Sequence, residues 1–190
     1  MKWNGGYEMA RKTSHKRIFI SHAAIEDSDI ANAFKCWMIE VYQLHKSDVF
    51  VSSSPDSLTA EDFWTAVIGK NLRKHNIMVV LLTKASISKR WVVFEMGAGY
   101  QVETLIPPIL CKGAKVSDIP SRDPLTYLQA KRATSKAEFT AVLDELDKAI
   151  GRKRDYSKDE SLRRRLSKPT TKKKGRNRRK VYQGETTNGN

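Results

Sequence analysis

Short apolar runs alternate with longer amphipathic stretches along most of this chain. Four continuous apolar runs have the length of strands buried on both faces, and they span residues 17–22, 48–51, 77–82 and 105–110. Between and after them, apolar residues recur at helical spacing from about Ser28 to Leu44, from Thr59 to Leu72 and from Ser135 to Ile150. The pattern predicts strands that alternate with helices.

This alternation, with short connections, predicts an α/β fold built on one parallel sheet with helices on both faces and right-handed crossovers. We expect a flavodoxin-like, doubly wound sheet with strand order 2-1-3-4-5. Pro107 and Pro108 remove hydrogen-bond donors from the fourth run, which favours an edge or kinked position. A short fifth strand is expected near residues 125–129. Ser135 and Glu138 have the spacing of a capping box at the start of the last helix.

Periodicity and charge divide the chain into three parts. Residues 1–16 lack periodicity and are expected to form a flexible leader, whereas residues 17–151 form the folded domain, with Gly151 as a helix stop. Residues 152–190 hold 15 of the 35 basic and 4 of the 21 acidic residues, so they carry +11 of the net charge of +14. Such a segment is predicted to be disordered. It is either a solubilising tail or a segment that attracts nucleic acid or an anionic lipid surface.

Cysteines, histidines and hydropathy exclude several classes of protein. Cys36 and Cys111 lie in apolar surroundings without ligand or disulfide-framework spacing, which is typical of buried thiols in a reducing compartment. The four histidines form no ligand pattern, so we expect no metal site. No apolar run approaches the roughly 18 residues of a transmembrane helix, and the polar start lacks the apolar core of a signal peptide. A soluble cytoplasmic protein is therefore expected.

The stretch 88–100 carries the candidate chemistry. Trp91 and Glu95 are four residues apart, so on a helix an aromatic ring would stand beside a carboxylate, which suits a cationic aromatic ligand. The stretch follows the third strand, and the predicted crevice lies between strands one and three, where Ser21 and His22 end the first strand. A glutamate near a helix start also commonly complements the helix dipole or pairs with a lysine, so that interpretation of Glu95 stays open.

In their order and spacing these motifs resemble the TIR (Toll/interleukin-1 receptor) domain family, particularly its bacterial members, over residues 17–150. The residues that carry the resemblance are the first strand 17–23 with Glu26-Asp27, the second strand with Ser52, Trp64, Ser88, the Trp91-x-x-x-Glu95 element and Ile106-Pro107. The resemblance implies a TIR-like fold that self-associates through the domain.

In enzymatic members of that family, the glutamate of the Trp-x-x-x-Glu element cleaves NAD at the bond between nicotinamide and ribose. The resemblance therefore implies that Glu95 is catalytic and that Trp91 lies near the substrate. Further substrate-binding candidates are Ser21, His22, Phe19 and Ser53. NAD would be a substrate, with no cofactor, and the products would be nicotinamide and ADP-ribose or a cyclic isomer. A role in bacterial defence against phage or in signalling is implied in the same way.

Other interpretations remain open on the sequence. Trp91 and Phe19 each also fit a core position. The loop 52–62 lacks the glycine that many family members carry, and no arginine follows the first strand, where His22-Ala23-Ala24 stands instead. The first alternative to an NAD-cleaving enzyme is a non-enzymatic TIR module that acts by TIR–TIR association. The second is a nucleoside-processing transferase on a similar sheet, which would ignore NAD.

Overall fold

The computed structural model describes residues 16–23, 27–52, 74–87, 89, 104–120 and 129–169. Within these ranges the strands are β1 (Ile18–Ser21), β2 (Val49–Val51), β3 (Ile77–Leu82), β4 (Thr104–Leu105), β5 (Ile109–Leu110) and β6 (Lys131–Arg132). The α-helices are α1 (Ser28–Tyr42), α3 (Lys84–Ile87), α5 (Lys136–Ile150) and α6 (Asp159–Ser167). Single turns of 3-10 helix form η1 (Lys46–Asp48), η3 (Val116–Asp118) and η5 (Tyr156–Lys158).

The strands form a parallel sheet in the order β2-β1-β3-β5-β6, with β4 also beside β3. This confirms the predicted order 2-1-3-4-5, because β4 and β5 together occupy the place of the expected fourth strand. Pro107 and Pro108 fall between the two pieces, where their missing N–H groups interrupt the ladder. The last described strand, β6, lies at 131–132, where the backbone N–H of Lys131 donates to the Pro108 carbonyl at 2.8 Å. A strand was expected near 125–129, of which residues 125–128 lie outside the described residues.

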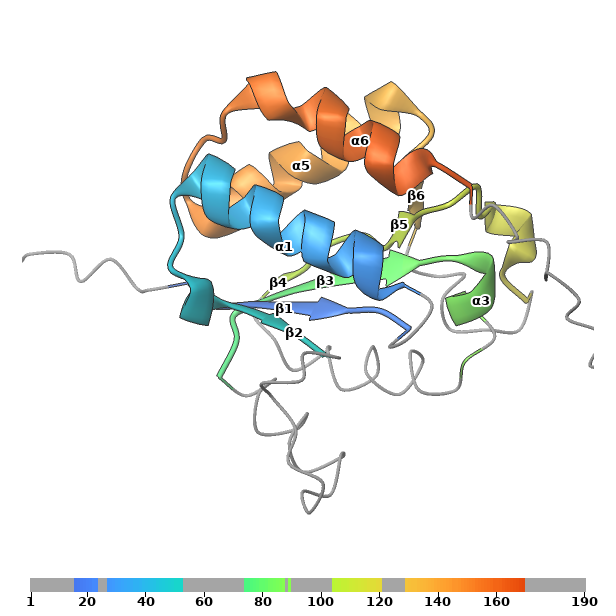
Figure 1. Ribbon diagram of the computed structural model, residues 1–190, viewed down its shortest axis with the longest axis horizontal. Helices are drawn as coiled ribbons and strands as arrows, with labels where there is room; N and C mark the ends of the chain where they lie inside the picture. Colours follow the sequence, from blue (N-terminus) through green and yellow to red (C-terminus); the bar gives the residue numbers. More distant parts are fainter. Residues whose placement is uncertain are drawn as a thin grey trace, which may run out of the picture.

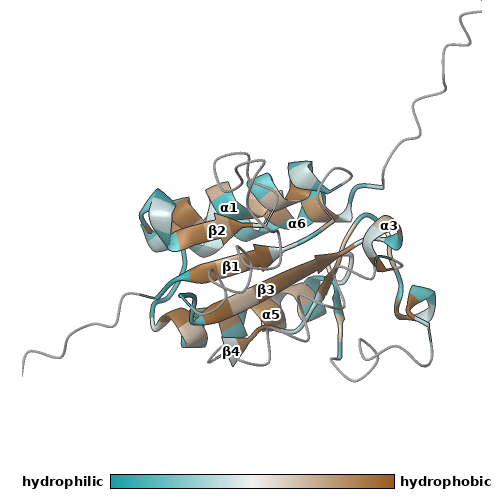
Figure 2. Ribbon diagram, turned by 90° about the horizontal axis from the view of Figure 1, so that it is seen from below, coloured by the Kyte–Doolittle hydropathy of each residue, from teal (hydrophilic) through white to brown (hydrophobic). Residues whose placement is uncertain are grey.

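Alternate residues of the central strands point into two separate cores. Ile18, Ile20 and Val79 share one core with α1, α5 and α6, and Figure 1 shows these three helices on one side of the sheet. On the other face, Phe19 and Met78 pack in a second core with residues that include Ile87 of α3 and Ile119. Figure 2 shows the apolar character of β1 and β3 along their length. The helices expected at 59–72 and within 88–100 lie outside the described residues.

The start of α5 uses half of the predicted capping box. The Ser135 hydroxyl accepts from the backbone N–H of Glu138 at 3.4 Å, as expected for a helix cap. In a full capping box the Glu138 carboxylate would accept from the backbone N–H of Ser135, but here it has another partner. It accepts from the backbone N–H of Arg132 at 2.7 Å and from the Arg132 guanidinium, so it ties the helix to the end of β6. Gly151 ends α5 in the left-handed region, at φ 77°, as its position in the sequence predicted.

Residues 152–169 differ from the disordered tail that the charge pattern predicted. They form η5 and α6, and α6 packs on α1 and α5 (Figure 1). Leu162 and Leu166 are four residues apart, so they lie on the same face of α6, and both are buried, at 4 % and 0 % exposure. Two leucines suffice because α1 and α5 already supply the apolar surface that they cover. The folded part thus extends past Gly151, and residues 170–190 and 1–15 lie outside the described residues.

Cys36 is exposed, although its sequence surroundings predicted burial, whereas Cys111 is buried as expected. The difference arises because Cys36 falls between the buried positions of α1, which include Phe34, Trp37 and Met38. Burial raises the pKa of the Cys111 thiol far above its ordinary value. No helix among the described residues is long and apolar enough to cross a bilayer.

Candidate functional site

The carboxyl ends of β1, β2 and β3 meet at one edge of the sheet. β1 pairs with β2 on one side and with β3 on the other, so Ser21 and His22 lie at the same end of the sheet as the residues that follow those strands, Ser52 and Thr83. Ligands of open parallel sheets bind at this edge, where the order of the strands reverses. We call Ser21, His22, Asp27, Ser52, Thr83 and Lys112 the edge cluster.

His22 is buried at this edge and is neutral at pH 7. It is 1 % exposed, and its Nδ1 lies 3.2 Å from the Ser52 hydroxyl oxygen. Burial lowers the pKa of His22 from 6.5 to about 4, although a backbone hydrogen bond with Ile20 opposes the shift. The imidazole can therefore exchange hydrogen bonds with Ser52 without bringing positive charge to the edge of the sheet.

The depressed pKa of His22 predicts a loss of stability in mild acid. The unfolded chain takes up this proton near pH 6.5 and the folded chain only near pH 4. Stability is therefore complete above pH 6.5 and falls as the pH drops from there to about 4, by roughly 3 kcal/mol at most. In urea unfolding at pH 7 and near pH 4, His22→Gln should lose less stability than the wild type between the two pH values.

His45 supplies the matched control for this measurement. Its side chain is exposed and its Nδ1 contacts Ser47 close by in the chain, so His45→Gln replaces a histidine without removing a buried group. Equal acid sensitivity of His22→Gln and the wild type would contradict the assignment of the acid-labile group.

Asp27 joins three elements at the same edge. It precedes α1 but its carboxylate does not cap the helix. Instead, Oδ2 accepts from the Thr83 hydroxyl at 2.7 Å, and Oδ1 lies 3.4 Å from the Lys112 ammonium. Burial raises the pKa of Asp27, whereas Thr83 and Lys112 act to lower it. Lys112 also contacts Asp29 at 2.8 Å, so one ammonium connects the end of β5 to the start of α1.

Lys112 and Thr83 were not among the residues that sequence analysis selected. Thr83 directly follows the third apolar run, and Lys112 follows the fourth after one intervening cysteine. The rule that selected Ser21 and His22 would have found Thr83 as well. Lys112 adopts a left-handed conformation, with φ 50°, and its backbone N–H donates to the Leu166 carbonyl at 2.6 Å. Its pairing with Asp27 across 85 residues has no local signal in the sequence.

Phe19 lies within the core below this edge. It is 0 % exposed and stacks on Phe50, with ring centroids 5.3 Å apart, while His75 approaches its edge. A residue of a central parallel strand is covered on both faces, which explains this burial. The observed role of Phe19 is therefore in packing, and its contact with substrate stays a prediction.

The chain leaves β3 through a short helical turn. The Ser86 hydroxyl accepts from the Thr83 backbone N–H at 2.6 Å, and the Ser86 N–H donates to the Thr83 hydroxyl at 3.3 Å, which closes the turn α3. Ser86 thus belongs to α3. Glu95, Trp91 and Ser53 lie outside the described residues. No group of three potential ligand side chains in the described ranges could hold a metal ion.

Solved structures of other proteins resemble this chain. The chain resembles the TIR domains in the structure of the activated Roq1 resistosome directly recognizing the pathogen effector XopQ. The two share 14 % sequence identity, the match covers 79 % of each chain, and the TM-score is 0.42. No protein-family model and no curated protein matches the sequence.

Proposed function

We propose that this chain is a TIR-type enzyme that cleaves NAD at the bond between nicotinamide and ribose, with Glu95 as the catalytic residue. The observation that carries the proposal is the place of the Trp91-x-x-x-Glu95 element, which follows β3 in a parallel sheet where β3 adjoins β1. Segments that leave strands at such a reversal of strand order line the ligand sites of open α/β sheets. The proposal also rests on the motif resemblance to bacterial TIR domains.

The chemistry of NAD explains why a single carboxylate would be enough. Ordinary glycosides need an acid to protonate the leaving oxygen and a second carboxylate as base or nucleophile. The nicotinamide of NAD already carries the positive charge, so it departs neutral without a proton, and positive charge develops on the ribose. A carboxylate beside the sugar stabilises that charge and accepts hydrogen bonds from the ribose hydroxyls. Glu95 would supply this carboxylate.

The charge state of His22 is compatible with a cationic substrate. A protonated histidine at this edge would repel the pyridinium ring, but burial keeps His22 neutral at pH 7. Ser21 and His22 would contact the substrate from the end of β1, with Ser53 beyond β2 and Trp91 against an aromatic ring of NAD. By resemblance, a neighbouring domain completes the site, in a cytoplasmic enzyme of bacterial defence against phage or signalling.

Incubation of the purified full chain with NAD tests the proposal. Free nicotinamide should appear, and mass spectrometry should identify ADP-ribose or a cyclic isomer as the other product. Because assembly is expected to complete the site, the rate per protein molecule should rise with protein concentration. Light scattering on the same samples reports self-association. If associated protein released no nicotinamide, the enzymatic proposal would fail, and the interaction module would be the better account.

A further inference from the structure

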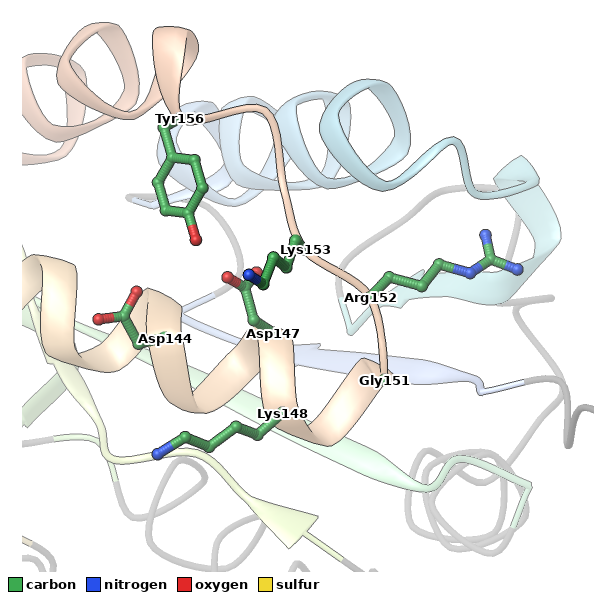
Figure 3. A pocket seen from close by; sticks show the side chains of 7 residues that line it. All are labelled: Asp144, Asp147, Lys148, Gly151, Arg152, Lys153 and Tyr156. Atoms are coloured by element: carbon green, nitrogen blue, oxygen red, sulfur yellow. The ribbon is translucent and has the colours of Figure 1, made fainter.

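A hollow of about 560 Å³ lies beside the carboxyl end of α5, apart from the proposed active site. Its lining comes from the last turns of α5 and from the segment that leads into η5, and comprises Asp144, Asp147, Lys148, Gly151, Arg152, Lys153 and Tyr156 (Figure 3). This volume is within the range of small-molecule sites, roughly 300–1,000 Å³. All seven lining residues lie in the last turns of α5 or after its end.

Tyr156 presents a fixed aromatic surface in this hollow. It is 55 % exposed, and it is one of two exposed large hydrophobic residues in the described ranges. The Arg154 guanidinium carbon lies 4.5 Å from the centre of its ring, so one face of the ring rests on a cation. Arg154 is itself held by Asp147 at 2.7 Å and Asp159 at 2.8 Å. The exposed part of Tyr156 is thus held in place for a ligand ring to stack on.

The charges around Tyr156 suit a ligand that has both a phosphate and a polar base. Lys148, Arg152 and Lys153 bring three positive charges to the lining, against two carboxylates. Asp147 is partly buried, with a side chain 12 % exposed, and accepts from the Tyr42 hydroxyl at 2.6 Å as well as from Arg154. Asp144 is half-exposed, and one of its oxygens lies 3.0 Å from Arg154 Nη1.

The direction of these side chains assigns their roles. In Figure 3, the hydroxyl end of Tyr156 points toward the side of α5 that carries Asp144 and Asp147. Arg152 extends away from them, and Lys148 lies on the opposite side of α5 from Tyr156. Arg152 donates to the Tyr42 carbonyl at 3.2 Å. This leaves Lys153 as the lining cation for a phosphate, and Asp144 as an acceptor for the amino group of a base.

We propose that this hollow binds a nucleotide unit, with its base stacked on Tyr156, its phosphate near Lys153, and an amino group of the base donating a hydrogen bond to Asp144. Stacking on an exposed aromatic ring beside basic residues is how proteins bind single-stranded nucleic acid. The sequence favours a strand as the source of the nucleotide, because residues 170–190 add seven lysines and arginines and only one acidic residue.

An anionic membrane has the same negative charge as a nucleic-acid strand, but it suits this surface less well. Helices that bind in a bilayer surface insert exposed apolar side chains. The leucines of α6, Leu162 and Leu166, are buried against the domain, and the exposed large hydrophobics of the described ranges are Val116 and Tyr156 alone.

Fluorescence anisotropy with the full chain separates this site from the basic tail. The probes are a labelled adenine strand of about 20 nucleotides and an abasic strand of the same length, which offers phosphates without bases. The wild type should bind the adenine strand more tightly. Tyr156→Ala should weaken adenine-strand binding about 5- to 150-fold, the effect of losing one stacked base, and should leave the abasic strand unaffected. Tyr156→Phe, which keeps the ring, should bind as the wild type does.

Further arms test the phosphate contact and the source of the nucleotide. Lys153→Ala should reduce the slope of log affinity against log salt by about one, while Lys136→Ala, at the far end of α5, should not. Competition by AMP would identify free nucleotides as ligands of the hollow, and binding without competition would identify the strand. An adenine strand should outcompete a thymine strand, which lacks the amino group.

Several outcomes would overturn the proposal. Equal affinity of the wild type for adenine and abasic strands would show that phosphates alone are bound. Retention of the adenine preference by Tyr156→Ala, with circular dichroism confirming its fold, would remove the ring from the site. Binding to vesicles rich in anionic lipid, without binding to either strand, would assign the charge to a membrane. None of these results depends on cleavage of NAD.

Discussion

Replacing Glu95 with glutamine is expected to slow the release of nicotinamide from NAD by about 100- to 1,000-fold. Glutamine has nearly the same shape as glutamate and can still accept a hydrogen bond from a ribose hydroxyl. It lacks the negative charge that would stabilise the positively charged ribose in the transition state. The loss should therefore fall on kcat much more than on KM, since the substrate in its ground state carries no charge on the sugar.

Glu103 provides a matched control for this variant, because it is an acidic residue eight positions further along the same segment. Glu103→Gln removes the same charge from the chain and should leave turnover close to that of the wild type. Thermal unfolding of both variants checks that the fold is retained. Undiminished turnover by Glu95→Gln would dismiss Glu95 as the catalytic group, and a loss shared equally by both variants would point to a general effect of charge.

Arg154→Ala is expected to destabilise the folded chain by about 3–5 kcal/mol, because it leaves buried carboxylates without their cation. The Arg154 side chain is 0 % exposed, and it contacts Asp144, Asp147 and Asp159 at 3.0, 2.7 and 2.8 Å. Asp144 is 49 % exposed and can turn to water, but Asp147 and Asp159 are 12 % and 18 % exposed. Burial already raises the pKa of Asp159, and Arg154 opposes that shift.

The stability lost in Arg154→Ala should be lost first at the attachment of α6 to α5. Asp159 begins α6, whereas Asp147 belongs to α5, so Arg154 fastens the two helices together. Hydrogen exchange should show α6 opening in Arg154→Ala before the strands of the sheet do. Arg164→Ala is the control, because this arginine of α6 is 77 % exposed and pairs with Glu160, which is 42 % exposed. It should cause little measurable change. Equal stability of both variants would contradict the anchoring role of Arg154.

Local patterns along the chain were sufficient to predict most of the sheet and two of the helices. The apolar run 77–82 is β3, Ser28–Tyr42 forms α1 close to the expected bounds, and Ser135 begins α5 as its spacing predicted. Each of these elements is specified by neighbours within a few residues, through periodicity, a cap or a stop. The strand order followed from chain connectivity, since short crossovers leave few arrangements of parallel strands.

The candidate site was predicted only in part for the same reason. Ser21 and His22 could be placed at the switch between β1 and β3 because they end a buried run. The contacts that define their surroundings, such as Thr83 with Asp27 across 56 residues, depend on elements far apart in sequence. The neutrality of His22 is likewise a property of burial, which no spacing along the chain specifies.

The sequence by itself determined a parallel α/β sheet, its order, the edge where polar residues gather and the stretch that carries Glu95. Only the tertiary structure decided that the folded domain continues past Gly151. A segment as highly charged as 152–169 has too few apolar residues to fold by itself, and the sequence pattern correctly reports that deficit. The missing apolar surface comes from α1 and α5, and the missing charge partner for Arg154 comes from aspartates on two helices. Order in this segment is thus a consequence of contacts that exist only after the rest of the chain has folded.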